Sequence, residues 1–190
     1  MKTYLVTGAA GFIGSNFVKY MLQKHNDIRI VVLDALTYAG NLSTIAEDID
    51  NDRCTFIRGN ICDRALVDRL FVEYRFDVVV NFAAESHVDR SIENPQLFLQ
   101  TNILGTQNLM DCARSAWVSG KDSNGYPTWR AGVRFHQVST DEVYGSIVAG
   151  RVDEEAPLQP SSPYAATKAS ADLLAMAAHH TFGQDVVITR

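Results

Sequence analysis

The 190-residue sequence has few cysteines, few prolines and no long apolar run. Cys54, Cys62 and Cys112 are odd in number and lack C-x-x-C spacing, so we expect neither a disulfide framework nor a metal site and favour a reducing, cytoplasmic setting. Only 5 prolines beside 12 glycines, with 46% hydrophobic residues, exclude collagen-like and disordered chains. Because no run reaches about 18 apolar residues, we expect no membrane-spanning segment.

An excess of positive charge is also missing. The sequence has 17 Lys and Arg against 22 Asp and Glu, which gives a net charge of -5. Proteins that bind a phosphate backbone need a concentrated basic surface, so we expect no nucleic-acid partner. At roughly 150 residues per domain, the length predicts one domain with room for a sizeable core.

Short β-rich apolar runs alternate with longer segments of helical period, which predicts βαβ units around a parallel sheet. The expected strands are Tyr4–Thr7, Arg29–Asp34, Thr55–Arg58, Asp77–Phe82, Val133–Ser139 and Val186–Thr189. The expected helices are Phe12–Lys24, Leu42–Asp48, Arg64–Tyr74, Pro95–Trp117 and Pro163–Phe182. The strand runs are nearly continuous in Val, Ile and Leu, as expected where helices cover both faces of a sheet. The sequence therefore predicts an α/β, Rossmann-like, doubly wound parallel sheet.

Two segments interrupt this alternation. Val118 to Gly132 contains three glycines and several polar residues, so we expect a surface loop in which Trp117 and Trp129 serve as packing anchors. Ser146 to Ser161 is acidic and contains prolines. This second segment is a solvated connector or a lid beside a site, and we favour the connector.

A glycine turn follows the first expected strand and opens the first helix. Gly8, Gly11 and Gly14 let the backbone bend tightly and approach a pyrophosphate, while the helix N-terminus supplies unpaired N–H groups. Asp34 ends the second strand 20 residues after Gly14, where a carboxylate accepts hydrogen bonds from ribose hydroxyls and repels a 2′-phosphate. We therefore predict NAD rather than NADP; an ordinary structural turn with Asp34 as its cap is the alternative.

Tyr164 and Lys168 are four residues apart in the expected helix that begins at Pro163, so their side chains share one face. Ser162 is well placed to cap that helix. A nearby ammonium favours the phenolate, so we expect Lys168 to lower the pKa of Tyr164 from about 10 and make it a base for a hydroxyl. On its own, such a pair also arises by chance on solvated helices.

Two adjacent acids come at the carboxyl end of the fifth expected strand, in the segment Ser139-Thr140-Asp141-Glu142-Val143-Tyr144-Gly145. Ligands of open α/β sheets bind at that edge. Neighbouring strand residues point to opposite faces, so Asp141 and Glu142 can address one substrate only if the chain leaves the strand there. Such a pair can supply one acid and one base; the alternative is a solvated acidic turn.

Together these residues resemble the extended short-chain dehydrogenase/reductase family of nucleotide-sugar enzymes. The resemblance rests on the glycine turn with Asp34, the Tyr-x-x-x-Lys pair and the Ser-Ser-Pro-Tyr that precedes it. Within that family, the strings Leu36–Asn41, Ala83–Ser91 and Ser139–Gly145 are similar to those of dTDP-glucose 4,6-dehydratases. The Asp-Glu pair separates this group from the sister 4-epimerases, which generally lack it.

The resemblance implies a lyase that converts dTDP-glucose to dTDP-4-keto-6-deoxyglucose with NAD. Tyr164, tuned by Lys168, would take the proton of the 4-hydroxyl during oxidation of carbon 4. Glu142 would then remove the carbon 5 proton, and Asp141 would protonate the departing 6-hydroxyl before hydride returns to carbon 6. Thr140 would hydrogen-bond the 4-hydroxyl.

The same resemblance implies the binding residues. Ser86 and Thr140 would contact the substrate. The cofactor site would comprise Gly8, Gly11, Phe12, Ile13, Gly14, Asp34, Thr37, Asn60, Ile61, Phe82, Ala83, Thr101, Tyr164 and Lys168. Asn60 stands where the family usually has an Asp that binds the adenine amino group, and its amide oxygen can accept the same bond. We expect His136 to be a packed strand residue, and His87 to contact the sugar or pyrophosphate without proton chemistry.

The family continues beyond the last expected strand with a C-terminal region that binds the substrate's nucleotide. We therefore expect residues 1–190 to be the NAD-binding Rossmann domain, without most of the substrate domain. By the same resemblance we expect a homodimer formed through Pro95–Trp117 and Pro163–Phe182. The alternatives are a nucleotide-sugar 4-epimerase, a dehydratase of another nucleotide sugar, or a non-catalytic NAD-binding fragment.

Overall fold

The computed structural model describes residues 1–49 and 52–190 and is built on a six-stranded parallel sheet. Its strands are β1 (Lys2–Thr7), β2 (Ile28–Asp34), β3 (Cys54–Arg58), β4 (Val78–Asn81), β7 (Arg134–Val138) and β8 (Val186–Thr189). The order β3-β2-β1-β4-β7-β8 is the doubly wound arrangement, in which the winding direction reverses between β1 and β4. The predicted Rossmann-like fold is confirmed, and its topology predicts a ligand crevice where β1 and β4 end.

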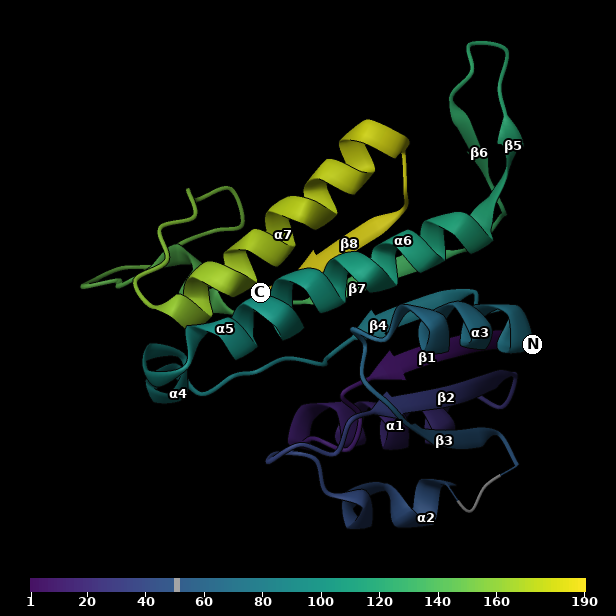
Figure 1. Cartoon of the computed structure of the whole chain (residues 1–190), viewed down its shortest axis with the longest axis horizontal. Coiled ribbons are helices and arrows are strands. Elements are labelled where there is room, and N and C mark those ends of the chain that lie inside the picture. Colours follow the sequence, from purple (N-terminus) through teal and green to yellow (C-terminus); the bar gives the residue numbers. More distant parts are fainter. Residues whose placement is uncertain (50–51) are drawn as a thin grey trace.

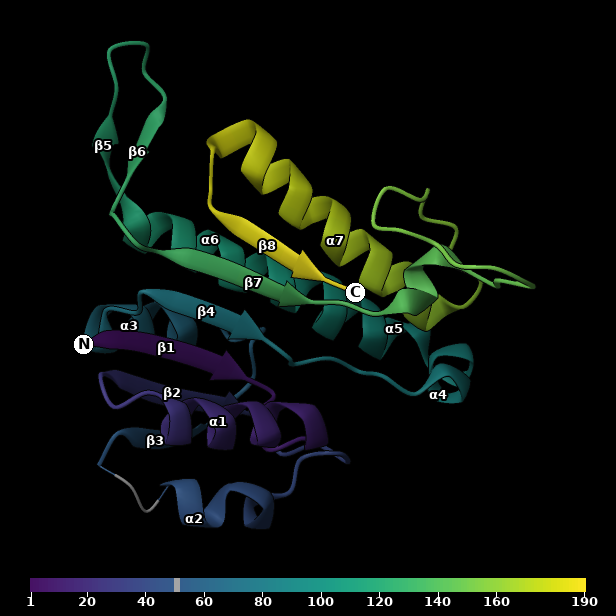
Figure 2. The same cartoon turned by 180° about the vertical axis from the view of Figure 1, so that it is seen from behind.

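Helices cover both faces of this sheet. The long helices are α1 (Phe12–Lys24), α3 (Arg64–Tyr74), α6 (Thr106–Trp117) and α7 (Pro163–Phe182). The short ones are η1 (Leu42–Ile45), α2 (Ala46–Ile49), α4 (Val88–Glu93), α5 (Pro95–Phe98), the π-helical η2 (Leu99–Gly105) and η3 (Asp141–Tyr144). Figure 1 shows α3, α6 and α7 in front of the sheet, and Figure 2 shows α1 on the opposite face.

The two apolar cores follow from the alternation of side chains along each strand. Leu5 points into the core beneath α3, α6 and α7, whereas its neighbour Val6 points into the core beneath α1. Val31 and Val32 divide in the same way. Strands buried on both faces have no polar side to expose, and this explains the continuous apolar runs of the sequence.

Two expected helices are interrupted. The segment expected as one helix over Leu42–Asp48 is a 3₁₀ turn, η1, followed by the short helix α2. The helix expected over Pro95–Trp117 consists of α5, the π-helical η2 and α6 in succession. A π segment adds a residue to the helical turn and is frequent near functional sites. Periodicity alone predicted neither break, because both keep the chain helical.

The expected surface loop Val118–Gly132 contains an antiparallel hairpin, β5 (Val118–Lys121) with β6 (Pro127–Trp129). Asp122 closes its turn, because its Oδ1 accepts bonds from the backbone N–H of Asn124 at 2.8 Å and of Tyr126 at 2.9 Å. The segment lies at the surface as predicted, but the hairpin within it was not predicted. The two tryptophans are packing anchors as predicted: Trp117 is buried and donates from Nε1 to the Phe76 oxygen, and Trp129 packs against the same core.

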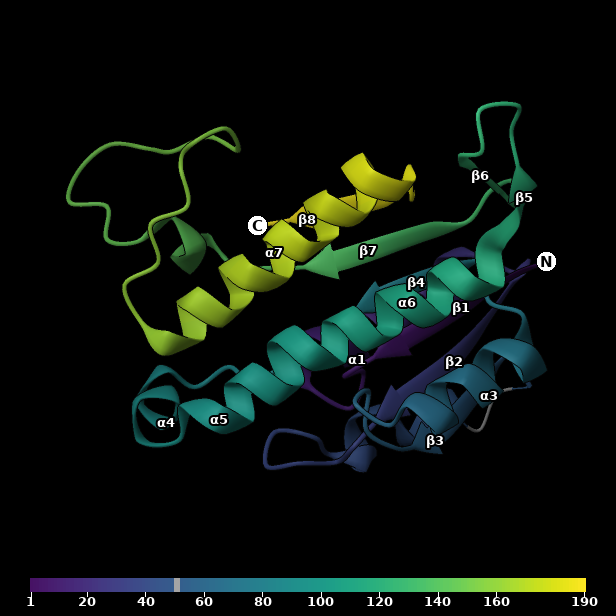
Figure 3. The same cartoon turned by 45° about the horizontal axis from the view of Figure 1, so that its top comes forward.

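Figure 3 shows α6 and α7 crossing the sheet side by side, with the hairpin at one end and the loop after η3 at the other. That loop, Ser146–Ser161, has no helix or strand and is mostly exposed. Gln159 fastens it to η3 by donating from its backbone N–H to the Val143 oxygen at 2.9 Å. Across residues 1–49 and 52–190, none of the helices combines the length and apolar character that crossing a membrane requires.

Candidate active site

A cavity of about 370 Å³ lies at the carboxyl edge of the sheet. It is lined by the glycine turn, by the segments that follow β2, β3, β4 and β7, and by α7. The predicted cofactor residues that line it are Gly8, Gly11, Phe12, Ile13, Gly14, Asp34, Thr37, Asn60, Ile61, Phe82, Ala83, Thr101, Tyr164 and Lys168. Ser86 lines it as well. Residues spread over 161 positions of the sequence, from 8 to 168, therefore meet in one cavity.

The glycine turn leaves no room for side chains. Gly8 has a φ of +67°, and a Cβ there would lie 2.6 Å from the Ala83 nitrogen. A Cβ on Gly14 would lie 2.6 Å from the Gly8 oxygen. Gly11, which precedes α1, supplies no capping side chain, so the first N–H groups of the helix face the cavity edge without one. A helix N-terminus of this kind is suited to an anion.

Asp34 joins the end of β2 to the glycine turn. Its Oδ2 accepts from the Ala10 N–H at 2.9 Å and its Oδ1 from the Leu36 N–H at 2.8 Å. The residue is 8% exposed and lines the cavity. Each carboxylate oxygen can accept two hydrogen bonds and here accepts one from the backbone, so both retain a lone pair for a ligand hydroxyl. The structural and the ligand-binding interpretations of this aspartate are therefore compatible.

A buried chain of polar side chains joins the strand ends. Thr7 donates to the amide oxygen of Asn81 at 2.6 Å, and the Asn81 amide donates to Gln137 at 2.9 Å and to Thr106 at 3.1 Å. All four residues are at most 1% exposed. Satisfied buried networks of this kind fix one arrangement of a core. These four residues were not predicted from the sequence. The signal that could have found them is a polar residue at the end of an apolar strand run, as at Thr7 and Asn81.

Tyr164 is the second residue of α7, and its backbone N–H donates to the buried Ser91 hydroxyl at 3.0 Å. Ser162 caps the helix as predicted, because its Oγ accepts from the Ala165 N–H at 3.0 Å. Tyr164 and Lys168 both line the cavity, so the expectation that they share one face is confirmed. The Lys168 amine donates to the Val138 oxygen at 2.7 Å.

The protonation of this pair differs from the expectation. Burial raises the pKa of Tyr164; a hydrogen bond with the Thr140 side chain lowers it, and the negative charges of Glu142 and Asp141 raise it further. Burial lowers the pKa of Lys168 to about 8, against the opposing pull of Asp172. The pKa of the tyrosine is therefore raised rather than lowered, because the lysine amine is committed to a backbone oxygen and desolvation dominates.

The acidic segment leaves the strand, which is the condition under which Asp141 and Glu142 can address one substrate. After β7 the chain forms η3, a 3₁₀ turn over Asp141–Tyr144, and the Thr140 hydroxyl caps it by accepting from the Glu142 N–H at 3.3 Å. Asp141 and Glu142 are exposed and lie close enough to Tyr164 to act on its pKa. The turn thus follows directly on Val138 and Ser139, which line the cavity, and lies beside the tyrosine, but residues 140–142 do not line the cavity themselves.

The loop after β4 reaches the cavity through Ser86. The Ser86 N–H donates to the Tyr38 hydroxyl at 3.4 Å, and the Tyr38 ring centre lies 5.1 Å from that of His87 and 4.2 Å from the Arg90 guanidinium. His87 is exposed. His136 is a packed strand residue as predicted: its Nε2 lies 3.0 Å from the Thr189 hydroxyl, and burial lowers its pKa.

Asn102 and Glu85 were not predicted as site residues. Asn102 lies in the π-helical η2 and brackets the Glu85 backbone, accepting from its N–H at 2.8 Å and donating to its oxygen at 2.9 Å. The Asn102 amide also donates to the Thr167 hydroxyl at 2.9 Å. Glu85 lines the cavity, and burial raises its pKa, while Arg90 lowers it. Asn60, also on the cavity wall, accepts from the Cys62 N–H at 2.9 Å.

Comparison with known proteins identifies the family. The family model described as GDP-mannose 4,6 dehydratase matches residues 5–190. The chain belongs to this dehydratase family. Among curated relatives, the dTDP-glucose 4,6-dehydratase of Xanthomonas campestris pv. campestris (strain B100) is 51% identical over 190 residues, covering 100% of this chain and 52% of the relative. That of Neisseria meningitidis serogroup B is 47% identical over 192 residues, with the same coverage.

Solved structures agree with the dehydratase assignment. The dTDP-glucose 4,6-dehydratase of Bacillus anthracis, in complex with NAD, has a TM-score of 0.84 at 41% identity and is matched over 100% of this chain and 54% of its own. DesIV of Streptomyces venezuelae, with NAD and TYD bound, has a TM-score of 0.86 at 47% identity, over 99% and 55%. The chain thus spans about half the length of the dehydratases that it matches.

Proposed function

We propose that residues 1–190 form the NAD-binding domain of a protein that converts dTDP-glucose to dTDP-4-keto-6-deoxyglucose. One observation carries this proposal: the turn with Thr140, Asp141 and Glu142 lies beside Tyr164, which lines the same cavity as the glycine turn. The dTDP-glucose 4,6-dehydratases among the relatives support the substrate, and the two NAD-bound dehydratase structures support the cofactor.

The residues of the cavity fit NAD. The cradle at Gly8 and Gly14, which a Cβ would fill, and the open N-terminus of α1 suit a pyrophosphate. Asp34 would accept hydrogen bonds from the ribose hydroxyls, and its negative charge would disfavour a 2′-phosphate. The wall formed by Ile61 and its neighbours would hold the remaining apolar surface of the dinucleotide. The other residues proposed to bind it are Gly11, Phe12, Ile13, Thr37, Asn60, Phe82, Ala83, Thr101, Tyr164 and Lys168.

When bound, NAD would supply a hydride acceptor for carbon 4 of the sugar and, once reduced, a hydride donor for carbon 6. The residues move the protons. Tyr164, as its phenolate, takes the proton of the 4-hydroxyl, and Thr140 positions that hydroxyl. Lys168 keeps N–H groups beyond the one bound to Val138, since an ammonium has three donors, and these remain for hydrogen bonds to a ligand in the cavity that Lys168 lines.

The ketone at carbon 4 acidifies the hydrogen on carbon 5. Glu142 removes this proton, and the C6–O bond breaks as Asp141 protonates the departing hydroxyl, which leaves as water. When carbon 6 regains hydride, Glu142 returns a proton to carbon 5. Ser86, which lines the cavity, contacts the sugar. Each properly placed proton-transfer group contributes typically about 10² to 10⁴ in rate. For the whole protein we also propose that it recognises the nucleotide of the substrate, forms a homodimer and works in the cytoplasm.

A 4-epimerase is the second candidate, because the UDP-Glc/GlcNAc 4-epimerase of Campylobacter jejuni shares the fold with a TM-score of 0.85 at 26% identity, over 99% of this chain and 52% of its own. An epimerase returns hydride to carbon 4 and needs no acid-base pair at carbons 5 and 6. The exposed acids beside Tyr164 therefore favour dehydration.

The test uses the full-length protein with NAD and dTDP-glucose. We expect a 4-keto-6-deoxy sugar as product and exchange of the carbon 5 hydrogen with deuterated solvent. Glu142→Gln should stop this exchange, while Glu155→Gln, an exposed acid of the Ser146–Ser161 loop, should leave it unchanged. Formation of dTDP-galactose, or exchange that survives Glu142→Gln, would overturn the assignment.

A further inference from the structure

Asp172 is a fully buried carboxylate on the helix that carries the tyrosine and the lysine. It follows Tyr164 by eight residues and Lys168 by four, so the three side chains share one side of α7. Its Oδ2 accepts from the Ser139 hydroxyl at 2.9 Å and from Nε of Arg190 at 2.8 Å. The carboxylate therefore joins α7 to the ends of β7 and β8.

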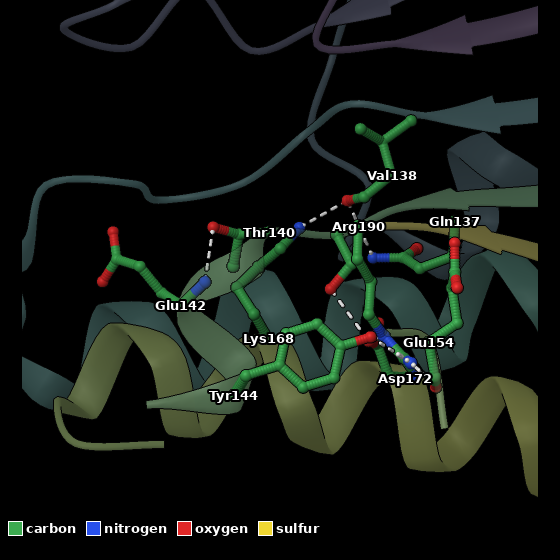
Figure 4. A network of polar contacts seen from close by, with 10 residues as sticks. Gln137, Val138, Thr140, Glu142, Tyr144, Glu154, Lys168, Asp172 and Arg190 are labelled. Atoms are coloured by element: carbon green, nitrogen blue, oxygen red, sulfur yellow. Dashed lines mark hydrogen bonds and ion pairs between the residues drawn. The ribbon is translucent and has the colours of Figure 1, made fainter. Parts of the chain in front are cut away.

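Arg190 extends this connection to the acidic turn. Its Nη1 donates to the Tyr144 hydroxyl at 3.0 Å and to the Glu154 backbone oxygen at 3.2 Å. Its guanidinium also lies 5.5 Å from the centre of the Tyr144 ring. Figure 4 shows the Arg190 nitrogens directed at Tyr144, Glu154 and Asp172. A planar guanidinium with several fixed donors suits this kind of multiple contact.

These contacts hold the acidic turn at both of its ends. Ser139 comes directly before the segment 140–142, and Tyr144 is the last residue of η3. The first is bonded to Asp172, and the second is bonded to Asp172 through Arg190. Since Asp172 lies on α7, the position of the turn is set relative to the helix of Tyr164 rather than by the strand alone.

The burial of this ion pair supports a positional role. The side chains of Arg190 and Asp172 are 12% and 0% exposed, whereas those of Arg134 and Asp185, which pair at the opposite end of β7 and β8, are 55% and 46% exposed. Burying two charges is costly, and one use of such pairs is to select a single arrangement. Neither Asp172 nor Arg190 lines the cavity, so direct contact with a ligand there does not account for them.

We infer that Asp172 and Arg190 are positioning residues that align the acidic turn with Tyr164 for the elimination step. This inference rests on the proposed function, because it concerns the alignment of Asp141 and Glu142 with a sugar held beside the tyrosine. The Asp172–Arg190 ion pair does not transfer protons itself. It sets where the two proton-transferring side chains stand.

The test combines kinetics with hydrogen exchange in the full-length protein. Asp172→Asn and Arg190→Gln should lower kcat for dehydration by about 10- to 100-fold, as expected for a small misplacement of reacting groups, with little change in KM or in NAD affinity. Amides of residues 139–145 should exchange faster in both variants, whereas those of the glycine turn, residues 8–14, should not. Tyr144→Phe, which removes one hydroxyl, should act in the same direction and more weakly.

Arg134→Gln is the matched control, because it breaks the exposed arginine–aspartate pair at the opposite end of the same two strands and should change neither readout. Unchanged exchange at 139–145, or faster exchange with unchanged kcat, overturns the inference. If the buried-pair variants do not fold, Tyr144→Phe decides by the same criteria. A wild-type protein that does not dehydrate dTDP-glucose would refute the proposed function. The amide hydrogen exchange of the variants would still show whether the Asp172–Arg190 ion pair holds the turn in place.

Discussion

The amine of Lys168 and the backbone oxygen of Val138 lie 2.7 Å apart, in a hydrogen bond that joins α7 to the end of β7. Lys168 is 4% exposed, and the same oxygen also accepts a longer bond of 3.5 Å from the Gln137 amide. A buried ammonium pays a desolvation penalty that one backbone oxygen offsets only in part. This relationship gives the protein a pH-dependent stability.

Burial lowers the pKa of Lys168 from 10.5 to about 8. Between these two values the unfolded chain binds more protons at this site than the folded chain, so the contribution of Lys168 to the free energy of unfolding rises with pH across that window. Relative to Lys168→Met, the wild type should gain about 2 kcal/mol between pH 8 and pH 10 in urea unfolding. Lys121→Met, at an exposed strand position, is the control; parallel pH curves for wild type and Lys168→Met would contradict the prediction.

The pKa of Tyr164 should shift in opposite directions in two variants. Glu142→Gln removes a negative charge that raises the pKa of Tyr164, so this pKa should fall. Thr140→Val removes the hydrogen bond that lowers the pKa of Tyr164, so it should rise. Tyrosinate ultraviolet absorbance, taken as the difference between each protein and its Tyr164→Phe counterpart, isolates this group among the seven tyrosines. Shifts of the same sign in both variants would refute the arrangement of the turn.

The glycine turn can be tested with two substitutions of the same kind. Gly8 and Gly125 both have positive φ, which Asn tolerates, but a Cβ on Gly8 meets the Ala83 backbone at 2.6 Å and one on Gly125 meets nothing within 4 Å. Gly8→Asn should therefore weaken NAD binding by at least about tenfold, or ~1.4 kcal/mol, in calorimetry. Gly125→Asn should leave it unchanged. Equal affinities in the two folded variants would argue against a dinucleotide at this turn.

If the whole protein is a homodimer, a charge introduced on the exposed apolar side of α7 should weaken dimerisation. Leu173 is 55% and Met176 is 40% exposed on this helix, and Leu104, in η2 just before α6, is 61% exposed. If these side chains are buried between two copies, Leu173→Asp should convert the full-length protein from dimer to monomer in light scattering. Val72→Asp, on the 77% exposed Val72 of α3, should not. A wild type that is monomeric at all concentrations would exclude the dimer.

Local patterns predicted the fold well for identifiable reasons. The glycine spacing at Gly8 to Gly14 and the aspartate at Asp34 are set by contacts within one βαβ unit, which a short stretch of sequence encodes. The strand runs are apolar because both faces of the sheet are covered, so the six strands of the main sheet and their parallel arrangement were predicted. The hairpin after Trp117 was missed because glycines and polar residues are equally typical of a tight hairpin turn and of a loop.

The amino-acid sequence by itself determined the doubly wound sheet, the glycine turn and the presence of a tyrosine, a lysine and two acids near one edge, because spacing along the chain encodes each of these. The tertiary structure alone decided the high pKa of Tyr164, the partner of Lys168 and the buried pair of Asp172 and Arg190. Burial and charge at a side chain depend on segments distant in sequence. Their effects arise only when those segments pack together.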